Sequence, residues 1–197
     1  MAAKPSGLRR WLTTVDHRDV GLLYLAFGSA SGLLGALDAM MLRTDALSPR
    51  PGVWETGTYD ALFTTHGLTM LFLFAGPVVF GLANYLLPLL VGADDMAFPR
   101  VNAVAFWVLP PAALLMRAGI VADLLGVPGF GPLATGWTLY PPMSAESPNP
   151  DVDLVLLGLH LSGLGTVMGA INVVVTVLVS REIAWRDLDV FSWTLLV

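Results

Sequence analysis

Residues 61–91, ALFTTHGLTMLFLFAGPVVFGLANYLLPLLV, decide the fold because this long apolar stretch contains no Asp, Glu, Lys or Arg. A helix needs about 20 apolar residues to cross the roughly 30 Å hydrocarbon layer of a membrane, since each residue rises about 1.5 Å. Residues 20–42, 101–121 and 154–179 also qualify, and a fifth apolar stretch begins near residue 190. The sequence therefore predicts an all-α, polytopic transmembrane bundle with four full spans and the start of a fifth.

The composition of the whole chain agrees with a membrane protein. Of 197 residues, 55% are hydrophobic and only 13% are charged, whereas a soluble domain carries about 25% charged residues. The mean hydropathy is +0.71. The chain has no cysteine, which excludes disulfides and thiolate metal sites, and its net charge of -5 argues against a nucleic-acid partner.

The two ends of the chain lead to two expectations. Residues 1–19 are polar and Arg-bearing and lack the short apolar region of a secretory signal, so the first span is expected to stay in the mature protein. The fifth apolar stretch stops at residue 197. We therefore expect the sequence to be a fragment or a partial sequence.

Basic residues predict the orientation, because cytoplasmic loops retain Lys and Arg. Most lie on the side of the N-terminus, namely Lys4, Arg9, Arg10, Arg18, Arg100, Arg181 and Arg186. Arg43, Arg50 and Arg117 fall on the other side. We therefore expect a cytoplasmic N-terminus. The outer loop, residues 126–153, has no Lys or Arg and is rich in Gly and Pro, which predicts an irregular cap.

Small residues recur along two of the spans and predict close helix packing, because they let backbones approach in lipid. They are Gly28, Gly32 and Gly35 on the first span, and Gly158, Ser162, Gly165 and Gly169 on the fourth.

The three histidines are the main candidates for metal chemistry. His66 lies near the outer end of its span, and a polar group in hydrocarbon costs several kcal/mol unless it is satisfied. A neutral imidazole is also the commonest metal ligand, so position alone supports a ligand and a satisfied core histidine equally. Gly67 beside it would let a flat macrocycle approach. Position favours a core histidine for His160 and a solvated interfacial side chain for His17.

Two charged residues lie near the outer end of the first span. Arg43 is expected either to extend to the interface or to hydrogen-bond a substituent of a bound macrocycle. Asp38, one turn deeper, is expected to be satisfied by interfacial water, and we assign it no role.

On the inner side, residues 92–100, GADDMAFPR, connect the second and third spans. The adjacent carboxylates, which include Asp95, could collect protons. Asn84 and Asn102 lie just inside the neighbouring helices, where side-chain amides can hold a chain of water. The alternative, which the residues alone favour, is an ordinary polar turn in which Pro99 starts the next helix.

Motifs along nearly the whole chain resemble subunit I of the haem-copper terminal oxidases, the cytochrome c and quinol oxidase type. They are WLTTVDHRDVGLLYLAFG at 11–28, THG at 65–67, NYLLPLLVGADDMAFPRVNAVAFW at 84–107, TGWTLYPP at 135–142, LHLSG at 159–163 and GAIN at 169–172. The length and order of these motifs make the resemblance specific. It implies that residues 1–197 are the N-terminal part of a single subunit I domain.

The resemblance implies roles around a low-spin haem of a- or b-type. His66 corresponds to the family's axial ligand of that haem, and thus to a ligand of the haem iron. Arg43 corresponds to an arginine that contacts a ring substituent of the same haem. Trp137 corresponds to a tryptophan near the haem propionates.

The resemblance also implies a proton pathway from the inner face, the D pathway. Asp95 corresponds to the acid at its mouth, Asn84 and Asn102 to asparagines within it, and Tyr24 to a tyrosine close to it. The chain has Gly165-Thr166 where many members have two adjacent serines, so one hydroxyl of the upper pathway is missing.

The implied activity is that of a proton-pumping oxidase that reduces oxygen to water with electrons from cytochrome c, a copper protein or a quinol. The expected partners are the remainder of subunit I, subunit II, other oxidase subunits and the lipid of a prokaryotic cell membrane. The high-spin haem and copper of the full subunit take ligands from later helices. The family needs more histidines than the three present here, so this chain alone is not expected to reduce oxygen.

Three alternatives remain open at this point. A nitric oxide reductase-type relative is disfavoured by Asp95 and its two asparagines, because those enzymes generally lack the acid motif. A proton-coupled secondary transporter would use His66 and Asp95 as proton sites. A truncated scaffold would bind no cofactor.

Overall fold

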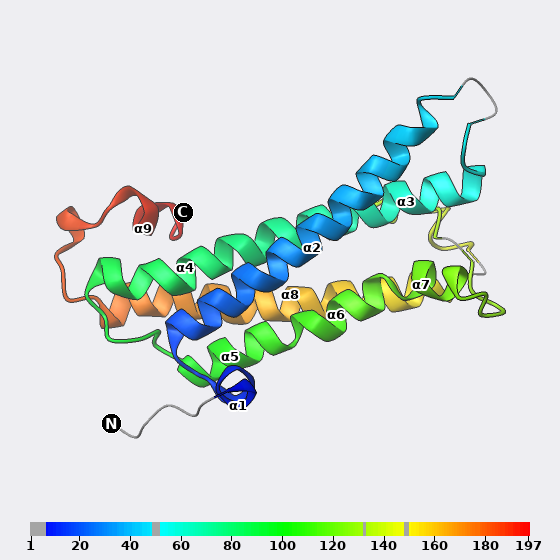
Figure 1. Cartoon of the computed structure of the whole chain (residues 1–197). Helices are drawn as coiled ribbons and strands as arrows, with labels where there is room; N and C mark the ends of the chain where they lie inside the picture. The colour runs from blue at the N-terminus through cyan, green and yellow to red at the C-terminus, as the bar shows by residue number, and fades with distance from the viewer. Residues whose placement is uncertain (1–6, 49–51, 132, 148–149) are drawn as a thin grey trace.

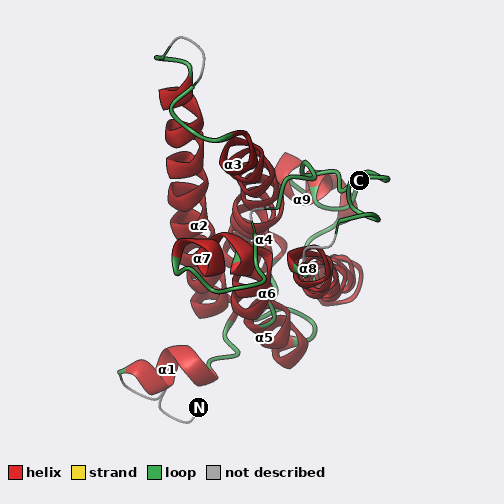
Figure 2. Ribbon diagram, turned by 90° about the vertical axis from the view of Figure 1, so that its right-hand side faces the viewer, coloured by secondary structure: helices red, strands yellow, loops and turns green. Residues whose placement is uncertain are grey.

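The computed structural model describes residues 7–48, 52–131, 133–147 and 150–197, and this part of the chain is built from helices, with no strand. Four helical segments are long and apolar enough to cross a membrane: His17–Asp45, Thr56–Val91, Pro99–Met116 and Asp151–Ser180. They run along one another (Figure 1), and Figure 2 shows them bundled when viewed from one end. The predicted all-α transmembrane bundle is confirmed.

The helices follow one another in the order in which Figure 1 labels them. They are α1 (Leu8–Thr13), α2 (His17–Asp45), α3 (Thr56–Leu68), the π-helix η1 (Thr69–Ala75), α4 (Gly76–Val91), α5 (Pro99–Trp107), α6 (Leu109–Met116), α7 (Ala118–Leu124), α8 (Asp151–Val175), the π-helix η2 (Thr176–Ser180), the short 3-10 helix η3 (Trp185–Asp187) and α9 (Val190–Thr194). The long helix α2 packs along α3, η1 and α4, and α8 packs along α5 and α6. A short helix, α9, begins at Val190, where the start of a fifth span is expected. It is too short to be a span by itself, so the fifth span stays a prediction.

The two ends of the bundle carry different parts of the chain. The first and last helices, α1 and α9, lie toward one end (Figure 1), which we call the N-terminal side, together with the loop between α4 and α5. The connections from α2 to α3 and from α7 to α8 lie at the other end, which we call the opposite side. As predicted, the described residues of the long α7–α8 connection form turns and irregular backbone.

The second span contains a π-helical turn that the sequence pattern does not predict. Pro77 has no backbone N–H, so it cannot donate to the carbonyl four residues earlier. The N–H of Gly76, the residue before Pro77, donates to the Leu71 carbonyl, five residues earlier. Such a turn is wider than an α-helical turn, and here it follows directly on the segment that carries His66.

The third span ends earlier than the predicted boundary at residue 121. The helix breaks at Arg117, whose backbone angles are φ -112° and ψ 4°, and α7 begins at the next residue. The guanidinium of Arg117 donates to Asp38 on α2. The apolar stretch in the sequence continues past Arg117, so hydropathy alone predicts a longer span. Hydropathy does not indicate a polar contact between two helices.

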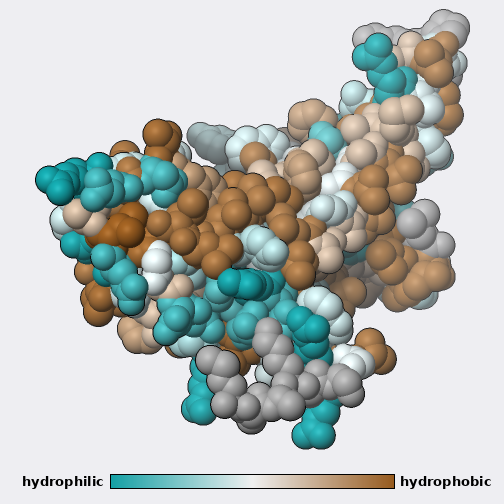
Figure 3. Space-filling view, turned by 60° about the vertical axis from the view of Figure 1, so that its left-hand side comes forward, coloured by the Kyte–Doolittle hydropathy of each residue, from teal (hydrophilic) through white to brown (hydrophobic). Residues whose placement is uncertain are grey.

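The surface of the bundle is apolar where lipid would surround it. Figure 3 shows hydrophobic side chains over the middle of the visible face and hydrophilic groups gathered mainly toward one end and one edge. Leu33 and Leu114, for example, are 70% and 75% exposed. Exposure of many large apolar side chains is unfavourable in water but favourable in the hydrocarbon of a membrane. The chain is therefore a multi-pass membrane protein.

The predicted stripe of small residues on α2 packs closely on its neighbours. A Cβ atom added at Gly28, Gly32 or Gly35 would lie within 3 Å of a side-chain atom of η1 or α4. On α8, Gly158, Gly165 and Gly169 make similarly close approaches to α6, α5 and α4. The packing prediction for these glycines is confirmed.

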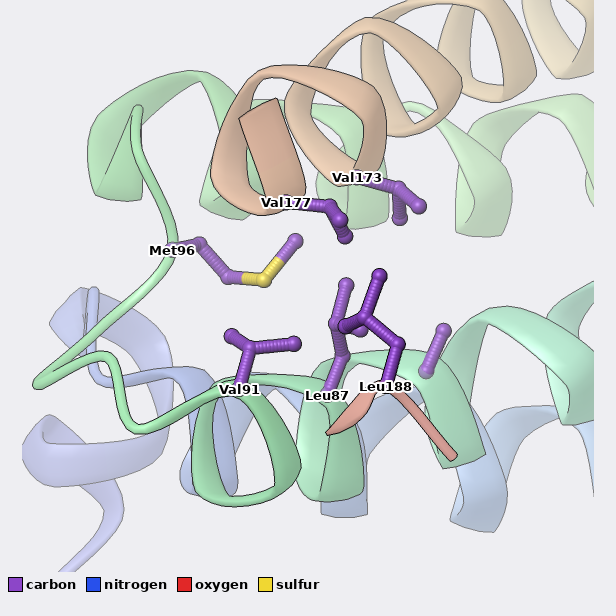
Figure 4. Packing of buried hydrophobic residues seen from close by; sticks show 7 residues of the cluster. Leu87, Val91, Met96, Val173, Val177 and Leu188 are labelled. Atoms are coloured by element: carbon purple, nitrogen blue, oxygen red, sulfur yellow. The ribbon is translucent and has the colours of Figure 1, made fainter. Parts of the chain in front are cut away.

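A cluster of buried side chains closes the N-terminal side of the bundle (Figure 4). It is made of Ala83, Leu87, Val91, Met96, Val173, Val177 and Leu188. Met96 belongs to the α4–α5 loop and is only 3% exposed. Its burial between α4 and α8 fixes the loop that carries Asp95.

Candidate functional site

His66 lies on α3 in the half of the bundle toward the opposite side. Its Nδ1 atom is 2.8 Å from the backbone carbonyl oxygen of Gly35 on α2. A carbonyl can only accept, so Nδ1–H is the donor and Nε2 carries the free lone pair. His66 is half-buried. A histidine held in this way has its tautomer and ring orientation fixed, as metal-binding histidines generally do.

The absence of a side chain at Gly35 makes this contact possible. A Cβ atom there would lie 2.7 Å from Sδ of Met70 and 3.3 Å from a methyl carbon of Thr69. The two helices therefore approach closely enough for the ring of His66 to reach the backbone of α2.

The loop before α8 folds back onto α3 beside His66. The N–H of Gly136 donates to Oγ1 of Thr64 at 2.9 Å. A Cβ atom on Gly67 would lie 2.8 Å from Cβ of Trp137. The missing side chain at Gly67 therefore lets Trp137 pack against α3, and the expectation that Gly67 leaves room for a macrocycle stays a prediction. The Trp137 side chain is itself 43% exposed, so part of it stays available to a bound group.

Arg43 does not join His66. It lies eight residues beyond Gly35 on α2, or about 12 Å along the helix, and its side chain is exposed. Within the described part of the chain, no hydrogen bond or ion pair connects these two side chains.

Asp38 is paired with a cation, and the expectation of interfacial water is wrong. Its carboxylate is buried and accepts from both terminal nitrogens of Arg117, at 2.9 and 3.0 Å. Nη1 of Arg117 also donates to Oγ1 of Thr69 at 2.8 Å. The pair went unrecognised because its partners are far apart in sequence and come together only through packing.

Asn84 and Asn102 meet at the N-terminal side of the bundle, as their places at adjacent helix ends predict. Both are buried, and the amide of Asn102 donates to Oδ1 of Asn84. The Asn84 amide donates in turn to the Phe80 carbonyl at 2.8 Å. Among the described residues, Oδ1 of Asn102 has no hydrogen-bond partner. Buried polar atoms of this kind are commonly satisfied by water.

Asp95 lies half-buried in the loop between α4 and α5. One of its carboxylate oxygens accepts from the N–H of Met96 at 2.7 Å. Burial raises the pKa of the Asp95 carboxyl, and this effect outweighs the opposing influence of the Met96 N–H and the nearby charge of His17. The acid therefore holds its proton to a higher pH than an ordinary aspartate.

His17 lies against this group, which the sequence reasoning missed. Its side chain is 3% exposed, and Nδ1 is 2.8 Å from the backbone carbonyl oxygen of Asn84. The expectation of a solvated interfacial histidine is wrong because the first turn of α2 packs on α4. The motif 11–28 contains His17, but nothing in its local polarity indicates burial.

Polar groups of α8 and η2 hold the loop that carries Asp95. Oγ1 of Thr176 accepts from the N–H of Ala97 at 2.9 Å, and Oδ1 of Asn172 accepts from the N–H of Phe98 at 2.8 Å. Neither side chain was singled out for this role. The available signal was the polarity of both residues within an apolar span, where polar groups need partners.

Tyr24 is buried between two aromatic rings, with ring centroids 6.2 Å from Phe80 and 5.2 Å from Phe106. It lines a cavity of about 410 Å³ that also reaches Ser162 and Thr166 on α8. The structure therefore places Tyr24 beside the hydroxyls of the fourth span.

His160 is exposed on α8, and its Nδ1 lies 2.7 Å from the Leu156 carbonyl of its own helix. The expectation of a core histidine is therefore wrong in this structure. No group of three His, Cys, Asp or Glu side chains among the described residues could hold a metal ion. Among the described residues His66 thus fits a metal as a single ligand, as to a haem iron, where the porphyrin supplies four further donors.

Comparison with known proteins shows which family the chain resembles. Residues 19–197 match the family described as cytochrome c and quinol oxidase polypeptide I. The chain is 45% identical to cytochrome c oxidase polypeptide 1 of Halobacterium salinarum, over 98% of this chain and 32% of that protein. It is 37% identical to cytochrome c oxidase subunit 1 of Candida albicans, over 96% and 36%. It is 38% identical to heme-copper oxidase subunit I+III of Aeropyrum pernix, over 95% and 23%.

The chain spans about a third of the length of the first two relatives and less than a quarter of the third. The matches nevertheless cover nearly the whole of this chain, and they include the segments that carry His66, Asp95 and Trp137. The chain therefore belongs to the cytochrome c and quinol oxidase polypeptide I family.

Proposed function

We propose that this chain is the N-terminal part of subunit I of a proton-pumping terminal oxidase, with residues 1–197 forming part of a single domain. The complete enzyme would reduce oxygen to water with electrons from cytochrome c, a copper protein or a quinol. Family membership supports this class of oxidoreductase and its haem and copper cofactors. The partners would be the rest of subunit I, subunit II and further oxidase subunits.

Within that enzyme, His66 would be the axial ligand of the low-spin haem. The observation that carries this role is the hydrogen bond from Nδ1 to the Gly35 carbonyl, which leaves Nε2 free to bind iron. The haem, when bound, supplies one-electron redox chemistry. Trp137 would contact its edge from the loop packed on Gly67, and Arg43 would approach a ring substituent from the end of α2.

Asp95 would collect protons at the N-terminal side. Its raised pKa lets it hold a proton up to a higher pH than an exposed aspartate does. Asn84 and Asn102 would hold water inside the bundle, which the unpaired Asn102 oxygen favours. Tyr24 would border the next stretch of the path, where the cavity reaches Ser162.

The N-terminal side would face the cytoplasm of a prokaryotic cell. The basic residues favour this orientation, and the pairing of Arg117 with Asp38 removes one cation from the count on the opposite side. Lys4 and Arg50, which also enter that count, lie outside the described residues. A proton moved outward would then work against about 2.3 kcal/mol per 100 mV of membrane potential.

The ligand role is tested with His66→Ala in the complete oxidase. We expect the low-spin haem band to disappear from the reduced-minus-oxidised spectrum, because no other side chain on α3 replaces the imidazole. His160→Ala is the matched control, since that histidine is exposed and bonded only to its own helix. A normal low-spin band in His66→Ala would refute the assignment.

A further inference from the structure

A buried ion pair lies close to the contact that orients His66. Arg117 donates from Nη1 to Oδ2 of Asp38 at 2.9 Å and from Nη2 to Oδ1 at 3.0 Å. The Asp38 side chain is 6% exposed and that of Arg117 17%. This two-pronged geometry is the strongest that a guanidinium and a carboxylate can form.

The ion pair and the histidine contact use the same two helical segments. Asp38 follows Gly35 by one turn on α2, and Thr69 follows His66 by one turn where α3 continues into η1. Nη1 of Arg117 donates to Oγ1 of Thr69 at 2.8 Å as well as to Asp38. Arg117, at the break between α6 and α7, therefore binds to both of the helical segments that form the His66–Gly35 contact.

Within the membrane such a pair is also an electrostatic element. The two charges balance each other, but a single one left unpaired in a low-dielectric surrounding acts strongly on nearby groups. Reduction adds an electron to the haem iron. An unpaired Arg117 would therefore favour the reduced haem, and an unpaired Asp38 would favour the oxidised haem.

We propose that Asp38 and Arg117 are positioning residues that hold the His66–Gly35 contact and keep the field at the low-spin haem balanced, thereby setting its reduction potential. This inference rests on the proposed function, in which His66 holds that haem. Neither side chain touches the iron ligand directly; both act through Thr69 and the backbone of α2.

The test is a spectroelectrochemical titration of the low-spin band in the complete oxidase. Asp38→Asn should raise the midpoint potential, Arg117→Gln should lower it, and the double variant should return it close to the wild-type value. A purely structural role would move both single variants in the same direction. That result, or potentials that stay unchanged in both, would overturn the inference.

Asp151→Asn is the matched control. Asp151 is also a buried carboxylate on the opposite side, but it accepts from the N–H of Gly119 at 2.9 Å and links α7 to α8. Its neutralisation should leave the haem potential unchanged. A shift equal to that of Asp38→Asn would show that any buried charge at this end has the same effect, contrary to the proposal.

The double variant also covers the case in which the single variants fail to assemble. Its two neutral amides keep the field balanced, so retained haem with a wild-type potential supports the proposal. Loss of haem, or a shift as large as in either single variant, contradicts it. The low-spin band of His66→Ala distinguishes failure of the proposed function from failure of this inference. If the band persists in His66→Ala, the proposed function fails. If the band is absent while the midpoint potentials of the Asp38 and Arg117 variants stay unchanged, only this inference fails.

Discussion

The two nitrogens of the His66 ring have separate tasks. Nδ1 donates to the Gly35 carbonyl at 2.8 Å, and this bond leaves Nε2 as the atom that can bind a metal. A backbone acceptor cannot titrate or change rotamer, so the ring is held more firmly than it would be by a flexible side chain. The ligand role proposed for His66 therefore depends on how closely α2 and α3 approach.

At Asp95 the account predicts a specific loss of proton uptake. Asp95→Asn should slow turnover by about 10²-fold, the lower end of the range for loss of a positioned proton-transfer group, and should stop pumping with haem spectra unchanged. Stopped-flow oxidation with a pH indicator measures both. Asp94→Asn is the control, because Asp94 lies next to Asp95 in the same loop but is exposed. Normal pumping by Asp95→Asn would place the entrance elsewhere.

The pH dependence of uptake follows from the same residue. Burial raises the pKa of Asp95 above that of an ordinary aspartate, so the carboxyl is protonated up to a higher pH. Uptake that passes through its protonated form should therefore fall as the pH rises through that value, and the fall should lie above the pH range of an exposed aspartate. The same titration of Asp95→Asn should lack this step.

The position of a residue at a helix end could be predicted from the sequence, whereas a contact that depends on how the helices pack could not. Asn84 and Asn102 were expected at adjacent helix ends and do form a pair. The burial of His17 depends on how the start of α2 packs on α4, and the partner of Asp38 lies far along the chain. Hydropathy and spacing carry no information about either contact.

At the scale of the elements, the contact between the long loop and α3 places Trp137. Gly136 bonds to Thr64, and Gly67 leaves the space that the Trp137 side chain fills. The four spans could be predicted from apolar length, but the turn at η1 and the break at Arg117 could not. The π-helical turn lies just before Pro77, which lacks a backbone N–H. The break at Arg117 accompanies a side-chain contact with Asp38 on another helix.

The loop contact yields a prediction about Gly67. Gly67→Ala adds a Cβ atom that would lie 2.8 Å from Trp137, so it should lower the stability of the complete oxidase by about 1–3 kcal/mol, the usual cost of overpacking. Thermal unfolding measures this change, together with a shift in the low-spin haem band. Gly163→Ala is the matched control, because nothing lies within 4 Å of a Cβ atom at that position. Equal stability of the two variants would contradict this prediction, because it would show that the loop carrying Trp137 can move aside without loss of unfolding free energy.

At the scale of the molecule, the candidate groups lie at opposite ends of one bundle. Asp95, Asn84 and Asn102 gather at the N-terminal side, and His66, Trp137 and the Asp38–Arg117 pair lie toward the other side. A redox-driven pump needs this separation between proton uptake and electron entry. The second span, made of α3, η1 and α4, carries His66 toward one end and Asn84 toward the other and so sets their spacing.

The central claim is that the imidazole of His66 binds the low-spin haem iron. The most direct measurement is the low-spin spectrum of His66→Gly in the complete oxidase, recorded with and without added imidazole. We expect the low-spin signal to be absent in the variant and to return when imidazole fills the space of the missing side chain. A full low-spin signal in His66→Gly without imidazole would contradict it.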